Sequence, residues 1–211
     1  MKKLFFLMST MLILTLTSFG QSSQTELAPP PSGGKTLLTG AIGLTFGSDK
    51  ATVKSVLSTK GNYEPSVDKP NMIGFLHVSI GTKTAGFVLC KFVDNKLYSI
   101  FCSFTPEAEN TSKAQELYDE FTTILTTKYG NAANSFRLFD YPFEDKSEDW
   151  DLAISSSKAT ISSYWFLPNK ETGNSIDLEI DKDYYVTIEY QSKALTDIAI
   201  ERQKSKDTNA F

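Results

Sequence analysis

Two cysteines are the residues of this chain that first suggest chemistry, since together they could form a disulfide, a metal-binding pair or a catalytic thiol. Cys90 and Cys102 lie in the stretch FVLCKFVDNKLYSIFCSF. A reactive thiol needs an exposed, electropositive environment, whereas both of these lie in apolar runs. His77 is the only histidine, which excludes multi-histidine zinc sites and leaves it as the sole partner for a Cys-His pair. We expect two buried side chains instead of a nucleophile.

The register of the predicted hairpin decides whether the two cysteines can bond. A loop with an odd number of residues places Cys90 and Cys102 on one apolar face, whereas a two-residue loop separates them. Three-residue loops put Cys90 opposite Tyr98 or Ile100; in the second case Cys102 is a diagonal neighbour at roughly 7 to 8 Å, beyond the usual disulfide span. Direct pairing needs a five-residue loop. Secretion would permit a disulfide, but the register favours free thiols.

An acidic run supplies carboxylates that could act in pairs or bind calcium. Asp145, Asp149 and Asp151 fall at ligand positions of an EF-hand loop, but Trp150 stands where glycine is required and Ser156 where a bidentate Glu is required. The run therefore predicts a solvated loop and no metal site. A Gly-Gly-Lys-Thr stretch near the N-terminus lacks the first glycine and the preceding strand of a phosphate-binding loop, and we expect no cofactor.

Aromatic side chains around this run are the best candidates for binding a ligand. Tyr141 and Trp150 border the acidic residues, and Tyr164 and Trp165 lie on a predicted strand. Consecutive residues of a strand point to opposite faces, so one of the latter two faces away from the other. An exposed aromatic ring could stack on a sugar or a protein partner, whereas a buried one would belong to a core between two layers.

The N-terminus has the pattern of a secretory signal peptide: two lysines, an apolar run and small residues before Gly20. We expect cleavage between Gly20 and Gln21, which leaves no transmembrane anchor. Loss of the two signal lysines leaves 19 basic against 25 acidic residues, a net charge of −6, which disfavours nucleic acid as a partner. Residues 21–35, QSSQTELAPPPSGGK, are typical of a disordered tether.

The elements that must position these residues indicate an α+β domain over residues 36–203, with subdomains 36–130 and 131–203 as an alternative, and a frayed tail at 204–211. A short helix begins at Ser48, and a long helix runs from Ser112, with Gln115 completing a capping box, to a stop at Gly130. A third helix is expected from Lys193 to Gln203. About six antiparallel strands are expected, over Ile73–Ile80, Gly86–Val93, Lys96–Phe104, KATISSYWFL, NSIDLEI and YYVTIEY. Asn134–Asp151 predicts an edge strand followed by an exposed loop.

The stretch Gly43-Leu44-Thr45-Phe46-Gly47-Ser48, followed by a short helix and then by Asp94-Asn95-Lys96-Leu97-Tyr98, resembles small cell-envelope modules. One group is the outer-membrane-assembly lipoprotein family, and the other is the β-lactamase-inhibitor-like modules; the resemblance spans Leu38 to Gly130. It implies small helices packed on an antiparallel sheet and a protein-binding role. The chain lacks the lipidated cysteine of the lipoproteins. In other features it looks like many uncharacterised secreted bacterial proteins.

The sequence thus predicts a secreted or periplasmic binding protein without enzymatic activity, associated with the cell envelope and partnered by a protein or a carbohydrate. Two alternatives stay open: a small secreted hydrolase that uses acidic residues, and a protein inhibitor of a secreted enzyme. An enzyme should show a concave pocket with converging polar groups, including residues of Asp140 to Asp151, and the most informative observation is whether Trp150, Trp165 and the acidic run meet at one cleft. A binding protein should show a broad face with aromatic side chains.

Overall fold

The structure, a computed structural model, describes residues 36–108, 110–166 and 173–209. All of them belong to one compact unit. The expected signal peptide and tether, residues 1–35, lie outside the described residues. The described helices are α1 (Lys50–Ser58), α2 (Thr111–Tyr129), α3 (Ser147–Ser155) and α4 (Lys193–Asn209).

The strands form an antiparallel sheet of eight, in the order β3-β4-β5-β6-β10-β9-β8-β7, and a separate two-stranded hairpin. The hairpin consists of β1 (Gly40–Ala41) and β2 (Leu44–Thr45). The large sheet consists of β3 (Val67–Lys69), β4 (Met72–Ile80), β5 (Lys83–Val93), β6 (Lys96–Phe104), β7 (Asn134–Phe139), β8 (Ala159–Phe166), β9 (Ser175–Ile180) and β10 (Val186–Gln191). The expected α+β class with an antiparallel sheet is confirmed. The strand number exceeds the expected six because β1, β2 and β3 are too short to show a repeating pattern.

The strand order divides the sheet into two halves of matching connectivity. In each half a helix precedes a run of antiparallel strands, α1 before β3 to β6 and α2 before β7 to β10, and the last strands of the two runs, β6 and β10, pair at the centre. The repeat is one of topology and not of residues, which is why the sequence shows only a shared helix-and-hairpin pattern. Because the halves share one sheet, they form a single core.

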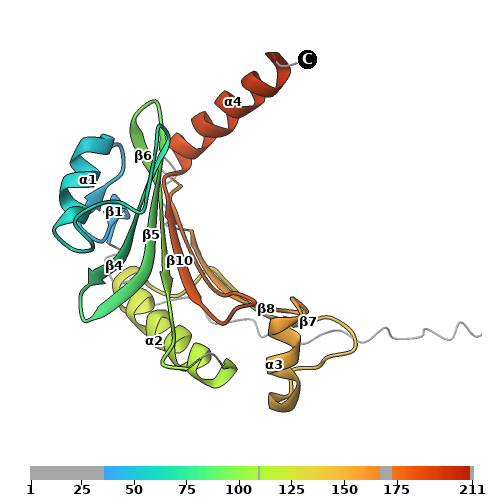
Figure 1. Cartoon of the computed structure of the whole chain (residues 1–211). Helices are drawn as coiled ribbons and strands as arrows, with labels where there is room; N and C mark the ends of the chain where they lie inside the picture. The colour runs from blue at the N-terminus through green and yellow to red at the C-terminus, as the bar shows by residue number, and fades with distance from the viewer. Residues whose placement is uncertain (1–35, 109, 167–172, 210–211) are drawn as a thin grey trace, which may run out of the picture. The chain divides into compact units, whose positions relative to one another are not determined.

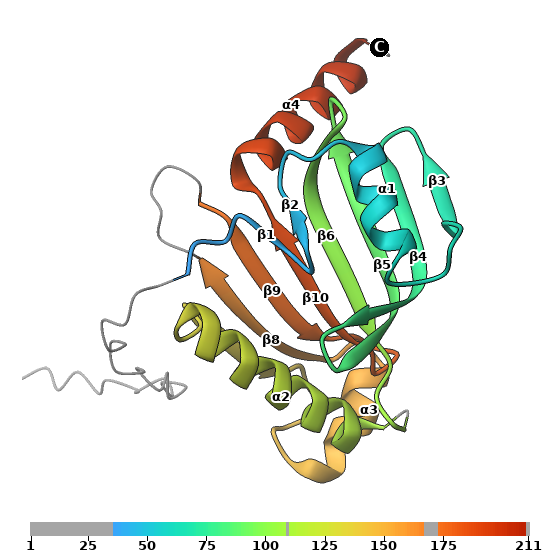
Figure 2. The same ribbon diagram turned by 90° about the vertical axis from the view of Figure 1, so that its left-hand side faces the viewer.

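One face of the large sheet is covered and carries the core. The helices α1 and α2 and the β1-β2 hairpin lie in front of it in Figure 2. Apolar residues at alternate positions point to this side and are buried, among them Val88, Cys90, Ile100, Cys102, Ile176, Leu178, Val186 and Ile188. We call this the covered face and the opposite one the open face.

Helix α2 covers the second half of the sheet because its apolar residues recur every three or four positions. Ala114, Tyr118, Phe121, Leu125 and Tyr129 are buried along one stripe, and the Phe121 ring lies 4.5 Å from the Phe104 ring, centroid to centroid. The helix ends at Gly130 as predicted.

Both predicted helix caps are displaced, that of α1 by one residue toward the C-terminus and that of α2 by two residues toward the N-terminus. Asp49, and not Ser48, caps α1 by accepting a 2.8 Å hydrogen bond from the Thr52 amide. Asn110, and not the Ser112 box, caps α2 by accepting from the Lys113 amide at 3.0 Å. In each case a carboxylate or amide just upstream reaches the amide three residues on, which is the geometry of an N-cap.

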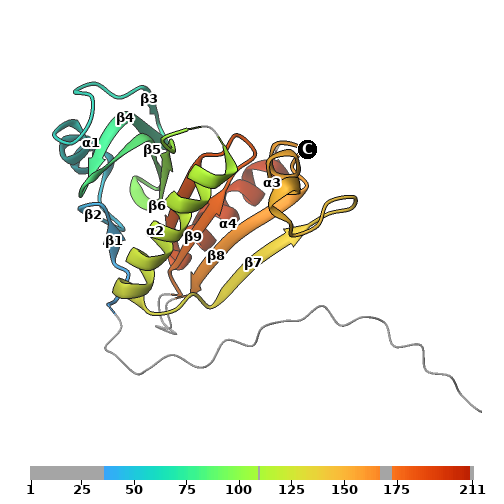
Figure 3. The ribbon, with the colours of Figure 1, turned by 90° about the horizontal axis from the view of Figure 1, so that it is seen from below.

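The predicted loop after the edge strand is partly wrong, because Ser147–Ser155 forms helix α3. Trp150, Ala153 and Ile154 are buried at helical spacing, a short stripe that the surrounding acidic residues obscure. Figure 3 shows α3 beside the ends of β7 and β8. The last helix, α4, also continues through Asn209 instead of ending near Gln203.

The hairpin of β5 and β6 places both cysteines on the covered face by a route that differs from the predicted odd loop. Its turn is the two-residue Asp94-Asn95, and both residues have positive φ, at 47° and 60°, as a tight hairpin turn requires. The register then shifts after Phe92, which leaves Tyr98 as an extra residue on β6. The bulge has the same effect on the register as one additional loop residue, so Cys90 lies opposite Ile100. Both thiols are free and buried.

Candidate functional site

The four aromatic residues singled out in the sequence do not meet at one cleft. Tyr141 is 92% exposed, whereas Trp165 is 1% exposed and donates its indole N–H to the Gly130 carbonyl at 2.9 Å. Tyr164, half-buried, lies on the open face with its ring 5.8 Å from the Phe136 ring. Trp165 thus belongs to the core and offers no surface to a partner.

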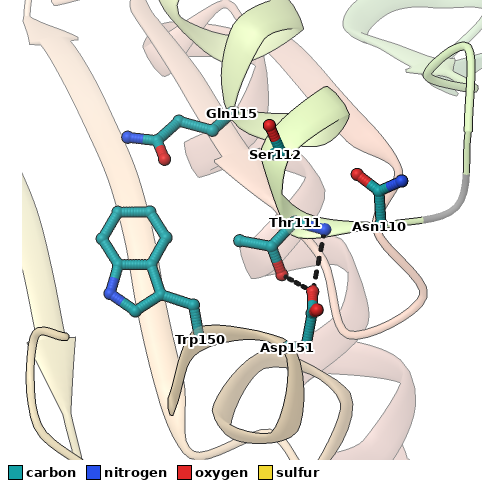
Figure 4. Close-up of a pocket in the computed structure, with 6 residues that line it drawn as sticks. All are labelled: Asn110, Thr111, Ser112, Gln115, Trp150 and Asp151. Atoms are coloured by element: carbon teal, nitrogen blue, oxygen red, sulfur yellow. Dashed lines mark hydrogen bonds between the residues drawn. The ribbon is translucent and has the colours of Figure 1, made fainter. Parts of the chain in front are cut away.

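Trp150 lies beside a shallow pocket of about 560 Å³ between α2 and α3, shown in Figure 4. The Arg137 guanidinium lies 4.7 Å from the Trp150 ring centroid, and the indole N–H donates to the Asp145 carboxylate at 3.1 Å. The pocket also exposes Gln115 and Ser112 from the first turns of α2.

The carboxylate of this pocket is already engaged in holding the fold together. Asp151 accepts hydrogen bonds from the Thr111 amide, at 3.0 Å, and from the Thr111 hydroxyl. It thereby satisfies an amide of the α2 N-terminus that has no partner within the helix. The pocket is therefore where α3 docks on α2, and its acidic residue is a helix cap.

The open face has a different composition. No described helix lies across its centre, since α4 contacts β5 and β6 at the end near the Asp94-Asn95 turn and rises away from it (Figure 1). Two rows of side chains cross it at neighbouring positions of the ladder. The first row is Leu89, Phe101, Glu189, Asp177 and Tyr164, and the second is Phe87, Ser103, Thr187, Glu179, Ser162 and Phe136.

Three carboxylates lie together at the middle of these rows, and we call Asp177, Glu179 and Glu189 the acidic strip. Asp177 of β9 is directly opposite Glu189 of β10, and Glu179 is two residues further along β9. Glu189 accepts a 2.6 Å hydrogen bond from the Ser99 hydroxyl and lies 3.3 Å from the Lys91 ammonium. Asp177 has an oxygen, Oδ1, that is buried and has no hydrogen-bond partner within the described part of the chain.

Burial and like charge act together on the strip. Burial raises the pKa of Asp177 to about 7, with the charges of Glu179 and Glu189 as further causes. Burial likewise raises the pKa of Glu179, and the charge of Asp181 adds to the effect. Groups with strongly shifted pKa values cluster at functional sites.

The sequence held a signal for the strip. The strands NSIDLEI and YYVTIEY alternate, so their acidic residues must share the face opposite Ile176, Leu178 and Ile188. That the two strands are neighbours, and that Asp177 and Glu189 are in register, could not be deduced from the alternation alone.

Among the described residues no cluster of His, Cys, Asp and Glu side chains is arranged to hold a metal ion. In the same residues no helix is long and apolar enough to cross a membrane. Searches of protein-family models, of curated proteins and of solved structures find no match to this chain.

Proposed function

We propose that this is a secreted or periplasmic binding protein of the cell envelope, without enzymatic activity, and that its binding surface is the open face of the eight-stranded sheet. The predicted signal peptide supports a location outside the cytoplasm. The partner is a protein or a carbohydrate that presents a surface wide enough to span several strands.

The observation that carries this proposal is the composition of the open face. An antiparallel sheet with one solvated face ordinarily presents polar side chains there. Here Phe87, Leu89, Phe101 and Tyr164 lie half-buried on that face beside the acidic strip. Aromatic side chains contribute a large share of the energy at protein interfaces, so the face has the composition of an interface.

Site-specific cross-linking in producing cells tests the proposal. A photoreactive phenylalanine analogue replaces Phe101 on the open face, and in a matched control it replaces Ile124, which is 48% exposed on α2. We expect discrete cross-linked species from position 101 and none from position 124. Equal patterns from the two positions would contradict an open-face binding surface.

The carboxylate pair favours a hydrolase as the second candidate. Asp177 and Glu189 are directly opposed on neighbouring strands, and retaining glycosidases use two carboxyl groups that lie roughly 5 to 5.5 Å apart. Asp177, with its raised pKa, would be the acid, and Glu189, which contacts Lys91, would be the nucleophile. Neither Asp177 nor Glu189 lines the pocket beside Trp150. The pair therefore lacks that pocket as a substrate site, which favours a binding protein over a hydrolase. Hydrolysis of an aryl glycoside that both Asp177→Asn and Glu189→Gln abolish would establish the enzyme instead.

A further inference from the structure

We propose that the open face binds a basic segment of another protein, whose Lys or Arg side chains lie over the acidic strip while its apolar side chains contact Phe101 and Leu89. This inference rests on the proposed function, because it names the chemistry of the partner for the same surface.

The first observation is an excess of negative charge in a small area. Asp177 and Glu189 are directly opposed across neighbouring strands, and Glu179 is on the same face of β9. Among the residues that the structure describes, Lys91 is the one cation that forms an ion pair with the strip, and its partner is Glu189. Like charges directly opposite in a sheet are destabilising. Cationic side chains from a partner would remove this repulsion, so the strip is complementary to a basic surface.

The second observation is a pair of buried polar atoms on this face that lack hydrogen-bond partners. Ser162 is 0% exposed, lies directly opposite Glu179, and its hydroxyl has no partner among the described residues. The Oδ1 atom of Asp177 is likewise buried and unpartnered. Buried polar groups in folded proteins are nearly always hydrogen-bonded. A guanidinium carries five donors in a planar fork, which suits acceptors that lie close together, as the carboxylates of the acidic strip do.

The surroundings of the strip favour a polypeptide over a bare cation. A metal ion needs converging oxygens, whereas these carboxylates are spread over two strands and the described residues contain no metal-holding cluster. Phe101 lies directly opposite Glu189, and Leu89 lies directly opposite Phe101. The row therefore has an apolar part, Leu89 and Phe101, next to an acidic part, Glu189 and Asp177. A partner that carries both positive charge and apolar side chains is complementary to both parts.

The binding should tighten as the pH rises. Asp177 is faced by Glu189 from β10, by Glu179 on its own strand and by Tyr164 from β8. Two charged groups lie further away: Lys91 of β5 contacts Glu189, and Asp181 lies beyond Glu179. Asp177 loses its proton near pH 7, and a cationic partner prefers the ionised form. The expected sign is therefore stronger binding at pH 8 than at pH 6.

The experiment uses the full mature chain and two labelled decapeptide probes that are identical except at five positions. One probe alternates arginine with leucine, and the other has citrulline, a neutral isostere, in place of each arginine. Affinities are measured by fluorescence anisotropy at physiological salt. We expect the arginine probe to bind at least about tenfold more tightly than the citrulline probe, since interfacial charge pairs reach that magnitude.

Variants locate the effect. Asp177→Asn and Glu189→Gln should each weaken binding of the arginine probe by about tenfold, and the matched change Glu116→Gln on the exposed surface of α2 should not alter it. Circular dichroism checks that each variant is folded. Equal loss in all three variants would overturn the inference, because it would indicate unspecific attraction to net charge.

Failure of this inference is distinguishable from failure of the proposed function. Equal affinity for both probes, lost in each case on Phe101→Ala, would overturn the basic partner and keep the open face as a binding surface. No binding of the arginine probe at millimolar concentration would overturn the inference, while the cross-linking at Phe101 decides the proposed function independently.

Discussion

Asp177 on β9 and Glu189 on β10 lie directly opposite each other, so two carboxylates occupy a cross-strand pair at the middle of the open face. Lys91 and Ser99 stabilise the Glu189 carboxylate, whereas one oxygen of Asp177 has no hydrogen-bond partner among the residues that the structure describes. Like charges directly opposite each other in a sheet cost stability.

The pair predicts how stability depends on pH. The pKa of Asp177 is raised to about 7 in the folded chain from an ordinary 3.8, so folding takes up a proton between these values. Its stabilising contribution is complete below about pH 4 and is lost as the pH rises through 7. Asp177→Asn should leave the melting temperature little changed at pH 4 and raise it by roughly 2–4 °C at pH 8, as about 1 kcal/mol would. Thermal scans across this range check it. Asp119→Asn, exposed on α2, is the control, and an equal gain there would contradict the assignment.

The two cysteines should behave as buried free thiols. Burial raises the pKa of Cys90 to about 12, and burial with the nearby Cys90 raises that of Cys102. A thiol reagent should therefore label neither cysteine in the native protein and both in denaturant, as mass spectrometry would show. Cys102→Ser should lower the free energy of unfolding more than Cys102→Ala, by about 1–3 kcal/mol, since it buries a hydroxyl. An unreduced mass that lacks two hydrogens would contradict the prediction.

The Trp165 indole links the end of α2 to β8 through the Gly130 carbonyl. Trp165→Phe keeps an aromatic ring but leaves that carbonyl without its donor, and should lower the free energy of unfolding by about 1–3 kcal/mol in urea titrations. Tyr141→Phe, at a side chain that is 92% exposed, should stay within about 0.5 kcal/mol of the wild type. Similar losses in both variants would show that the buried hydrogen bond has no special weight.

The Asp151 cap should be separable from any role of its pocket. Asp151→Ala removes the acceptor of the Thr111 amide and should lower the free energy of unfolding by about 1 kcal/mol. Asp151→Asn keeps an oxygen acceptor and should restore part of that loss. Urea titrations measure both, with Glu148→Gln on the exposed surface of α3 as control. Full stability in Asp151→Ala would contradict the cap.

The two edges of the sheet differ in their protection against unintended pairing. At one edge, β3 is three residues long and carries Asp68 and Lys69, followed by Pro70. At the other edge, β7 exposes Phe136 and Leu138, at 42% and 57%. Unprotected apolar edges promote association. Phe136→Lys combined with Leu138→Lys should reduce light scattering in concentrated solutions, whereas Leu152→Lys, 62% exposed on α3, should not. The reverse ranking would contradict the prediction.

The local patterns of the chain were sufficient for the elements with long, regular periodicity. The stripe from Ala114 to Tyr129 determined α2, and the alternating runs determined β4, β5 and β6, because burial of one face imposes a period of 3.6 or 2 on the residues themselves. The same alternation placed Cys90 and Cys102 on one face. Helix α3 was not predicted from the sequence, because its apolar stripe is only two turns long and lies within an acidic run.

What only the tertiary structure decided depends on which segments become neighbours. The pairing of β6 with β10 and of β10 with β9 brings Phe101, Glu189 and Asp177 into one row, although the first is far from the others in sequence. Likewise, Asp151 caps a helix that begins 40 positions earlier in the chain. The sequence determined which side chains point away from the core, because alternation is a local property. The strand order determined that three of them form an acidic strip, because neighbours across a sheet are chosen by the packing of the whole chain.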